Sequence, residues 1–594
     1  MSIAQNFGNV SPSLLLDFAN TKTLDRRITF TRSTPACHYD GKTTAMAEQN
    51  LITNSQVFTG APWVNVDNIA FTGSQTAPDG TSTATKLIPN TSNGLHRIFT
   101  STVASGATTT WTISIYAKAD GYNYLGIFIN GPDKGVLYNL SAGTASDTPF
   151  SPYTGATYSI TSVGNSWYRC VITVTGTSIE NFQLQSWNNT PAQTFAGDGT
   201  SGVIIWGAQL EARSTATAYT VTTTQPITNY IPVLLTAGGN QPRFDCNPTT
   251  GESLGLLIEE ARTNLVTYSA DYSNAAWGKT QCSIESNTIV APDGTLTGDK
   301  LIEDTASSVS HFISQSVSLG GSVDSSSYIF IAYAKAGQRT RIRMFDNNQN
   351  TSGDTTFNLS TGTIVSGTGT ITSVGNGWYR CAIFPLKNYS TTATPRIYLD
   401  DGTSSTYTGN GFSGVYIWGG QLEVATFPTS YIATTSASAT RTADDASMAG
   451  TNFSSWWNQN EGTYYIENSY GAFDNQPIAL CDLDLTGGNA WAYANGAGVL
   501  STFYASPVSL AINSSVTASI NINYRYASAF SPTGKAVSAS NTTAVVSANT
   551  ANPKPSTGIF IGRYSNAYYI NGRIKKIAYY PIRVTNAQLQ ALTS

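Results

Sequence analysis

The chain has 594 residues, 11% of them charged, and its formal net charge at pH 7 is −4. This length allows about three or four domains, and the scarcity of charged residues beside many Gly and Tyr favours strands and turns over helices. Such a weak charge provides no basic field to attract nucleic acid or an anionic membrane, so we expect neither as a partner.

The N-terminal region shows no pattern typical of export or membrane insertion. The first cationic side chain is Lys22, and the early apolar run at residues 14–16 is too short for a signal peptide. No stretch of about 18 apolar residues follows that would form a spanning helix. We therefore expect a chain that is made in a cytoplasm and does not insert into a membrane.

Four sequence motifs occur twice and keep the same order. The pairs are APDGT at 77–81 and 291–295, ISIYAKA at 113–119 with IFIAYAKA at 329–336, ITSVGNSWYRC at 160–170 with ITSVGNGWYRC at 371–381, and SGVIIWGAQLE at 201–211 with SGVYIWGGQLE at 413–423. Because each pair is separated by about 212 residues, the chain contains an internal repeat.

Each motif has the character of a strand or a turn. Large residues alternate with small or polar ones, and Pro-Asp-Gly and Val-Gly-Asn are turn sequences. The pattern predicts an all-β fold of tandem antiparallel β-sandwiches of the jelly-roll type, with very little helix. A parallel β-helix would need a repeat of about 20 residues, and the sequence shows no such period.

The repeat and its flanks divide the chain into five segments. They are an N-terminal segment for particle attachment or strand exchange at 1–49, a first β-sandwich at 50–221, a connector at 222–262, a second β-sandwich at 263–440 and a different module at 441–594. Within the connector, residues 254–258 are predicted to form a strand. At the C-terminus, Thr585 and Gln588 fit a capping box that predicts a short helix.

Several long phrases resemble tailed-bacteriophage structural proteins of the fibre, spike or decoration type, which carry carbohydrate-binding-like jelly rolls. The phrases are FTRSTPACHYDGK at 30–42, RFDCNPTTGESLGLLIEEARTNL at 243–265 and WGAQLE at 206–211 with a following Tyr. The closing INGRIKKIAYYPIRVTNAQLQAL resembles the end of concanavalin-A-like or laminin-G-like modules. The resemblance implies a virion location, contacts with other virion proteins and a homo-oligomer, with a trimer favoured.

Catalytic and metal-binding patterns are poor. The three histidines, His38, His96 and His311, lie far apart, and the cysteines lack the spacing of a metal site. Adjacent carboxylates such as Glu259 and Glu260 point to opposite faces of a strand, so they do not form the acid and nucleophile of a glycosidase. We expect that the chain is not an enzyme and that it has no cofactor and no metal site.

Aromatic residues supply the candidates for sugar contact, because their rings stack on sugar rings. The tryptophans that recur in both copies are expected to pack in the core; they are Trp167, Trp206, Trp378 and Trp418. Residues that differ between the copies and lie beside polar loops are better candidates. The predicted carbohydrate-binding residues are Tyr122, Tyr124, Trp187, Asn188, Tyr398 and Asp400.

These observations favour a virion fibre or spike adhesin that binds host-surface or environmental glycans through weak contacts multiplied by copy number. Two alternatives stay open. One is a capsid decoration or head-fibre protein without a specific ligand, and the other is a tailspike polysaccharide depolymerase. The missing β-helix period and carboxylate constellation argue against the depolymerase, whereas the sequence does not separate an adhesin from a decoration.

Overall fold

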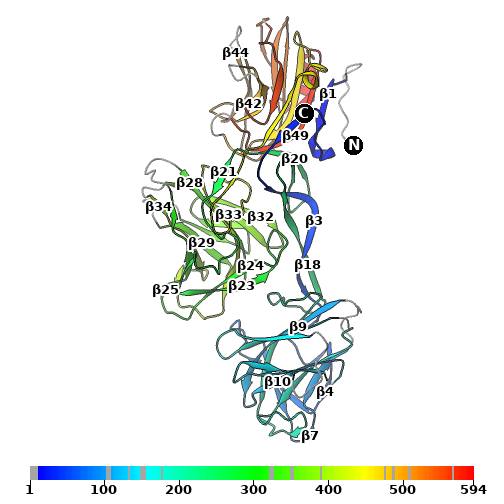
Figure 1. Ribbon diagram of the computed structural model, residues 1–594, viewed down its shortest axis with the longest axis vertical. Coiled ribbons are helices and arrows are strands. Elements are labelled where there is room, and N and C mark those ends of the chain that lie inside the picture. Colours follow the sequence, from blue (N-terminus) through cyan, green and yellow to red (C-terminus); the bar gives the residue numbers. More distant parts are fainter. Residues whose placement is uncertain are drawn as a thin grey trace.

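The computed structural model describes residues 11–101, 109–131, 134–147, 156–175, 178–319, 327–347, 354–387, 391–473, 477–483, 488–505, 510–550, 552–564 and 568–594. Three β-sandwiches follow one another along the long axis of the molecule (Figure 1). The pairs between strands are antiparallel and helices are short, which confirms the predicted all-β class. Within the described ranges, no helix is long and apolar enough to cross a bilayer.

The first sandwich, at the bottom of Figure 1, contains the first copy of the repeat. Its strands are β4 (Trp63–Asp67), β5 (Ile69–Gln75), β6 (Ala84–Pro89), β7 (Asn93–Gly94), β8 (Arg97–Thr100), β9 (Thr110–Asp120), β10 (Tyr124–Ile129), β11 (Gly135–Asn139), β12 (Thr144–Ser146), β13 (Thr157–Ser162), β14 (Tyr168–Thr175), β15 (Phe182–Trp187), β16 (Phe195–Ala196) and β17 (Gly202–Glu211). A six-stranded motif sheet, which holds the repeated motifs, has the order β13-β14-β9-β17-β6-β5. The outer sheet that faces it has the order β12-β11-β10-β15-β8-β4.

The second sandwich lies in the middle of the molecule. Its strands are β22 (Gly278–Thr280), β23 (Cys282–Ile289), β24 (Gly298–Glu303), β25 (Val309–Ser310), β26 (Phe312–Ser314), β27 (Val317–Ser318), β28 (Ser327–Lys335), β29 (Arg341–Asp346), β30 (Thr355–Asn358), β31 (Thr363–Ser366), β32 (Gly369–Gly375), β33 (Trp378–Lys387), β34 (Thr392–Ala393), β35 (Pro395–Asp400), β36 (Thr406–Tyr407) and β37 (Gly414–Val424). Its motif sheet runs β32-β33-β28-β37-β24-β23 and its outer sheet β31-β30-β29-β35-β26-β22. Strand for strand, this is the order of the first sandwich, as the internal repeat predicts.

The third sandwich is assembled from segments that are far apart in the chain. Its strands are β1 (Leu14–Asp17), β2 (Thr29–Thr31), β19 (Arg243–Cys246), β20 (Ser253–Ile258), β39 (Asp445–Ala449), β40 (Gly462–Ser469), β41 (Ile478–Asp482), β42 (Ala490–Ala494), β43 (Val499–Tyr504), β44 (Leu510–Thr517), β45 (Asn523–Ser531), β46 (Gly534–Ala539), β47 (Val545–Ser547), β48 (Gly558–Ile561) and β49 (Gly572–Tyr580). One sheet runs β19-β20-β49-β40-β45-β46-β47 with β1 beside β49, and the other runs β2-β39-β48-β41-β42-β43-β44.

This pairing gives the chain a nested plan. Strands β1 and β2 come from the segment 1–49 that the sequence sets apart for particle attachment or strand exchange, and β19 and β20 come from the connector 222–262. All four add to the sandwich of the C-terminal module. The first and second sandwiches are therefore insertions into a framework that the two ends of the chain close together.

In the part of the chain that the structure describes, three short helices accompany the third sandwich: α1 (Phe18–Thr21), α2 (Thr451–Ser454) and α3 (Asn586–Leu592). The side chain of Thr585 accepts a hydrogen bond from the backbone N–H of Gln588, and the Gln588 side chain accepts one from the Thr585 backbone in return. The predicted capping box and C-terminal helix are thus confirmed.

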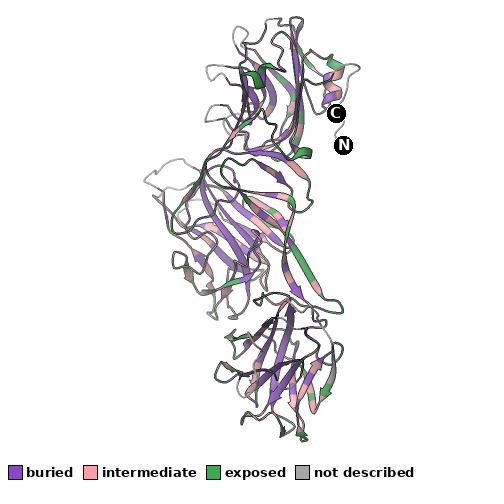
Figure 2. Ribbon diagram, turned by 45° about the vertical axis from the view of Figure 1, so that its right-hand side comes forward, coloured by how far each residue is buried: buried purple, intermediate pink, exposed green. Residues whose placement is uncertain are grey.

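A two-stranded ribbon connects the first sandwich to the rest. It pairs β3 (Ala36–Asn50) with β18 (Ile227–Ala237), and residues 228–230, near the end of the ribbon that meets the first sandwich, are exposed (Figure 2). One face of the ribbon packs on the motif sheet of the second sandwich, where Leu234 joins a cluster with Trp378 and Trp418. A short pair, β21 (Arg262–Asn264) with β38 (Ala439–Arg441), links the second sandwich to the third.

The four recurring tryptophans are buried, as expected, with exposed fractions between 0% and 3%. They lie on the outside of the motif sheets rather than between the two sheets. Trp378 and Trp418 are covered by the ribbon, and Trp206 packs against Tyr116 and Tyr219. The recurring motif therefore builds packing surfaces between parts of the chain as well as strands.

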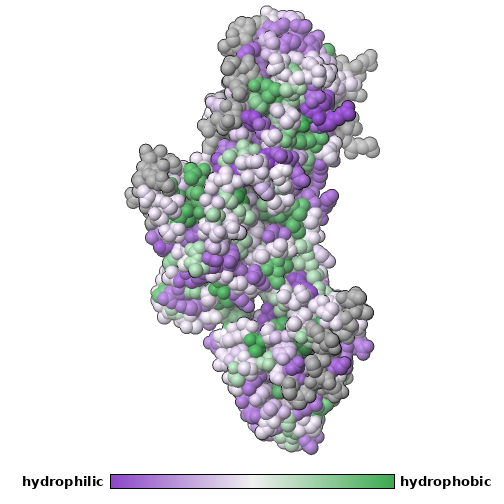
Figure 3. Space-filling model, viewed as in Figure 1, coloured by the Kyte–Doolittle hydropathy of each residue, from purple (hydrophilic) through white to green (hydrophobic). Residues whose placement is uncertain are grey.

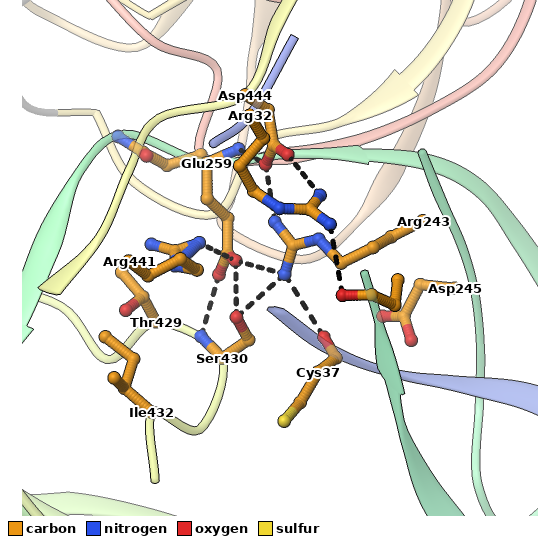
Figure 4. A network of polar contacts seen from close by, with 12 residues as sticks. Arg32, Cys37, Arg243, Asp245, Glu259, Thr429, Ser430, Ile432, Arg441 and Asp444 are labelled. Carbon is orange, nitrogen blue, oxygen red and sulfur yellow. Dashed lines mark hydrogen bonds and ion pairs between the residues drawn. The ribbon is translucent and has the colours of Figure 1, made fainter. Parts of the chain in front are cut away.

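A buried ion-pair junction joins the segment before β3, the connector and the third sandwich, and it reaches the ribbon where Arg243 donates to the Cys37 carbonyl oxygen (Figure 4). Arg243 contacts Glu259 at 2.8 Å and also pairs with Asp444, which Arg32 contacts at 2.9 Å. Arg441 pairs with Glu259 as well. The three guanidinium groups and the Asp444 carboxylate are fully buried, so the junction is part of the framework and offers no surface to a ligand.

Candidate functional site

Four of the six predicted carbohydrate-binding residues lie on the outer sheets. Tyr124 of β10 is opposite Trp187 of β15 in the first sandwich. In the second, Tyr398 and Asp400 of β35 are opposite Arg343 and Arg341 of β29. Because neighbours such as Leu125, Leu184, Ile397 and Leu399 fill the sandwich cores, strand alternation directs these four side chains away from the cores.

The outer face of the first sandwich is closed by its own side chains. Trp187 is 2% exposed, stacks on Phe128 with ring centroids 6.2 Å apart, and donates a 3.0 Å hydrogen bond to Gln185. Gln185 in turn donates to Gln183, which also accepts from Arg97. This chain of hydrogen bonds, which we call the glutamine ladder, pairs the polar groups of Trp187, Gln185 and Gln183 with one another. The indole ring is left with no open face for a sugar.

Tyr122 and Asn188 belong to loops at the end of the same sheet. Tyr122 is 8% exposed, and its hydroxyl accepts a 3.2 Å hydrogen bond from the backbone N–H of Asp198. The Asn188 side-chain oxygen accepts from the backbone N–H groups of Thr190 and Ala192. Both side chains shape loop turns, and their role in sugar contact stays a prediction.

The outer face of the second sandwich is more open. Six side chains of β26, β29 and β35 form what we name the arginine–aromatic face: Phe312, Arg341, Arg343, Phe345, Arg396 and Tyr398. All are partly exposed except Tyr398, which is 6% exposed. The β29 side of this sandwich points away from the β3–β18 ribbon (Figure 1), so the chain's own ribbon does not cover it.

Rings and guanidinium groups alternate across this face. The rings of Phe312 and Tyr398 have centroids 4.6 Å apart. The guanidinium carbon of Arg396 lies 4.7 Å from the Phe312 ring centroid, and that of Arg343 lies 5.3 Å from the Tyr398 ring and 5.4 Å from the Phe345 ring. These cation–π contacts hold the long arginine side chains flat on the sheet.

The three arginines differ in their charge partners. Arg343 forms an ion pair with Asp354 and also reaches the Ser405 hydroxyl at 3.3 Å. Arg396 donates a 2.9 Å hydrogen bond to the Tyr398 hydroxyl and, among the residues the structure describes, has no carboxylate partner; its Nε is buried without a hydrogen bond. Arg341 donates to the carbonyl oxygen of Gly402.

Asp400, the remaining predicted residue, is 6% exposed at the end of β35. One of its carboxylate oxygens accepts a 2.8 Å hydrogen bond from the backbone N–H of Gly402. This contact fixes the turn whose carbonyl oxygen receives the Arg341 side chain. Asp400 therefore positions the edge of the arginine–aromatic face.

Sequence reasoning did not select Phe312, Arg343 or Arg396. The matching sheet registers show that Arg396 occupies the position of Gln183 in the first sandwich, and Arg343 that of Gly126. An alignment of the two copies, searched for arginines present in one copy alone, would have pointed to both.

Two hollows among the described residues are lined by residues outside the arginine–aromatic face. One hollow of about 380 Å³ is lined by Leu265, Gln315 and Ser438, among others, and one of about 290 Å³ lies between the N-terminal strand and Arg525 in the third sandwich. Hydrophobic residues on the side of the molecule seen in Figure 3 are scattered rather than gathered in one patch. Among the described residues, no group of His, Cys, Asp and Glu could hold a metal ion.

Comparison with known proteins gives distant matches. No family model matches the chain, and no curated protein does. A sialidase of Trypanosoma rangeli in complex with sialic acid matches with 10% identity and a TM-score of 0.20, over 53% of this chain and 62% of the sialidase. The tandem CBM22 modules of Paenibacillus barcinonensis Xyn10C match with 11% identity and a TM-score of 0.18, over 65% of this chain and 100% of theirs.

These matches correct one expectation. The chain spans less than two thirds of the first sialidase, 62% of its length, and a second sialidase structure matches over 98% of this chain with a TM-score of 0.20. Solved sialidase structures are among these matches, so the expectation that the chain is not an enzyme is contradicted and we do not retain it. At TM-scores near 0.2 the matches assign neither an activity nor a substrate to this chain, and none of these structures bears on a bacteriophage origin.

Proposed function

We propose that the chain is a glycan-binding protein of a bacteriophage particle, of the fibre or spike type, and that the arginine–aromatic face of its second sandwich is the contact surface. The observation that carries the proposal is the difference between the two outer faces. The first sandwich buries Trp187 and its glutamine ladder, whereas the second leaves Phe312 and three arginines partly exposed. Exposed rings flanked by hydrogen-bond donors suit sugars, which have apolar ring faces and hydroxyl edges.

The nested plan supports such a role. The third sandwich and the buried junction form a framework, and the second sandwich is inserted into it with its outer sheet facing outward. A shallow face binds one glycan weakly, so a useful affinity requires many copies on one particle. The phage-like phrases and this need for multivalency support a homo-oligomer, of which we favour a trimer, that contacts other virion proteins.

A glycan array probed with the fluorescently labelled full chain tests the proposal. Phe312→Ala removes a partly exposed ring of the arginine–aromatic face and should weaken binding about tenfold or more, in line with the energy of aromatic stacking. Tyr230→Ala is the matched control, because Tyr230 is 59% exposed on the ribbon and remote from the arginine–aromatic face.

Each result on the array has a distinct meaning. Binding that Phe312→Ala lowers and Tyr230→Ala leaves intact supports the proposal. Whole virion particles, which carry many copies of the chain, are applied to the same array. If neither the chain nor the particles bind any glycan, a decoration protein without a ligand is favoured instead. Unchanged melting temperatures of both variants would show that the fold is intact.

A further inference from the structure

We infer that the arginine–aromatic face selects glycans that carry carboxylates, and that Arg396 is the residue that recognises the acidic group. This inference rests on the proposed function and narrows it to a substrate class. Arg396 is chosen because its guanidinium is held in place by neighbours that leave its charge unneutralised.

The positive charge of Arg396 is not cancelled by its neighbours. Its guanidinium contacts the Tyr398 hydroxyl at 2.9 Å and the ring of Phe312 beneath it. Neither contact cancels the positive charge, and no carboxylate among the described residues pairs with it. Arg343, by contrast, is already paired with Asp354. The face therefore offers one anchored guanidinium that lacks an anionic partner.

The terminal nitrogens of Arg396 are the part of its guanidinium that can meet a ligand, because Nε is buried while Nη2 has no hydrogen bond to a described residue and is not among the buried atoms. Planar N–H groups of a guanidinium match the two oxygens of a carboxylate. The Phe312 ring that supports Arg396 also belongs to the platform proposed for a sugar ring. A sugar packed against the exposed part of this ring, beside Arg396, would bring its own carboxylate within reach of the same side chain.

The spacing of the arginines indicates the length of the ligand. Arg341 lies opposite Asp400, four residues along β35 from Arg396. At roughly 3.3 Å per residue, the backbone positions of the two arginines are about 13 Å apart along the strand. One sugar ring does not span that distance, so the two arginines together favour an oligosaccharide with repeated acidic units.

The first sandwich provides an internal contrast. The position of Arg396 is occupied there by Gln183, which is 3% exposed and bonded to Arg97 and Gln185. Arg97 itself is neutralised by Asp67 at 2.7 Å. The same fold thus carries a closed, internally paired face in one copy and an open face with an unpaired cation in the other.

The test compares each acidic ligand with a neutral form of itself. Oligogalacturonates, glucuronate-containing oligosaccharides and sialylated glycans are printed beside their methyl esters, and the full chain is applied at low and physiological salt. We expect the carboxylate forms to bind at least about tenfold more tightly than the esters, and Arg396→Gln, which installs the residue of the first copy, to abolish this difference.

Two further variants control for charge and shape. Arg525→Gln removes an exposed arginine from the third sandwich, where its side chain is 45% exposed, and should leave the preference for acids unchanged. Arg396→Lys keeps the charge but loses the planar fork, and should retain part of the preference. The melting temperature of each variant is measured beside wild type to verify folding.

The outcomes separate this inference from the proposed function. Equal binding of acids and esters that still depends on Phe312 overturns the inference and leaves the proposed function standing. A preference for acids that Arg396→Gln does not change also overturns it. Binding to no glycan on the array defeats both.

Discussion

Leu16 of β1 lies directly opposite Ile577 of β49, so strands from near the two ends of the chain are paired in one sheet. Both side chains are buried in the core of the third sandwich, at 3% and 0% exposure. The first and second sandwiches are inserted between these ends. The stability of the framework that presents the arginine–aromatic face therefore depends on residues near the N-terminus.

Replacing Leu16 by Ala should destabilise the third sandwich by about 2–5 kcal/mol, because the change removes buried methyl groups and leaves a cavity. Amide hydrogen exchange of β49 in the full chain measures the effect. Leu15 is the matched control, since it is on the same strand but 39% exposed, and Leu15→Ala should change exchange little. If the amides of β49 are equally protected from hydrogen exchange in both variants, the packing of Leu16 in β1 is not needed to stabilise the third sandwich.

Replacing Glu259 by Gln should destabilise the buried junction by about 3–5 kcal/mol, because Arg243 and Arg441 would lose a buried charge partner. Glu252→Gln is the comparison: Glu252 pairs with Lys575 but is 60% exposed, and its loss should cost about 1 kcal/mol or less. Urea unfolding monitored by tryptophan fluorescence compares the two. If both variants lower the free energy of unfolding by similar amounts, the buried junction does not contribute more to stability than an exposed ion pair.

Acid should weaken the same junction. Burial by itself would raise the pKa of Glu259, but Arg441 and Arg243 outweigh burial and hold the pKa well below the ordinary 4.5. A carboxyl whose folded pKa is lowered adds stability above its unfolded pKa and loses it as the pH falls further. We therefore expect the urea midpoint to fall below about pH 4.5, and to fall less steeply in Glu259→Gln. An identical pH profile for the variant would contradict this assignment.

The shared strand order of the two repeated sandwiches could be predicted, because the repeated motifs are local and keep their sequence in both copies. The alternation in ISIYAKA and IFIAYAKA and the turns between motifs are visible within a few residues, and β9 and β28 occupy matching places in their sheets. The nested third sandwich could not be predicted in the same way. Strand β2 has three residues and pairs with β39. A sequence that short does not indicate which strand it pairs with.

The candidate site was predictable in part. Tyr398 and Asp400 do lie on or beside the arginine–aromatic face, but Trp187, selected on the same grounds, is closed off by Phe128 and Gln185. Sequence alone does not reveal whether an outward-facing aromatic is covered by its neighbours. Arg396 was missed because it is distinguished by having no carboxylate partner among the described residues. Only the packed structure shows which carboxylates lie near a given arginine.

Glycan bound to the arginine–aromatic face of the second sandwich would be visible in a crystal structure. The crystals are of the full chain, soaked with the oligosaccharide that binds best on the array. We predict a sugar ring against Phe312, with an acidic group at the guanidinium of Arg396. Sugar bound to the first sandwich or to the third, with the arginine–aromatic face occupied by solvent, would contradict the account.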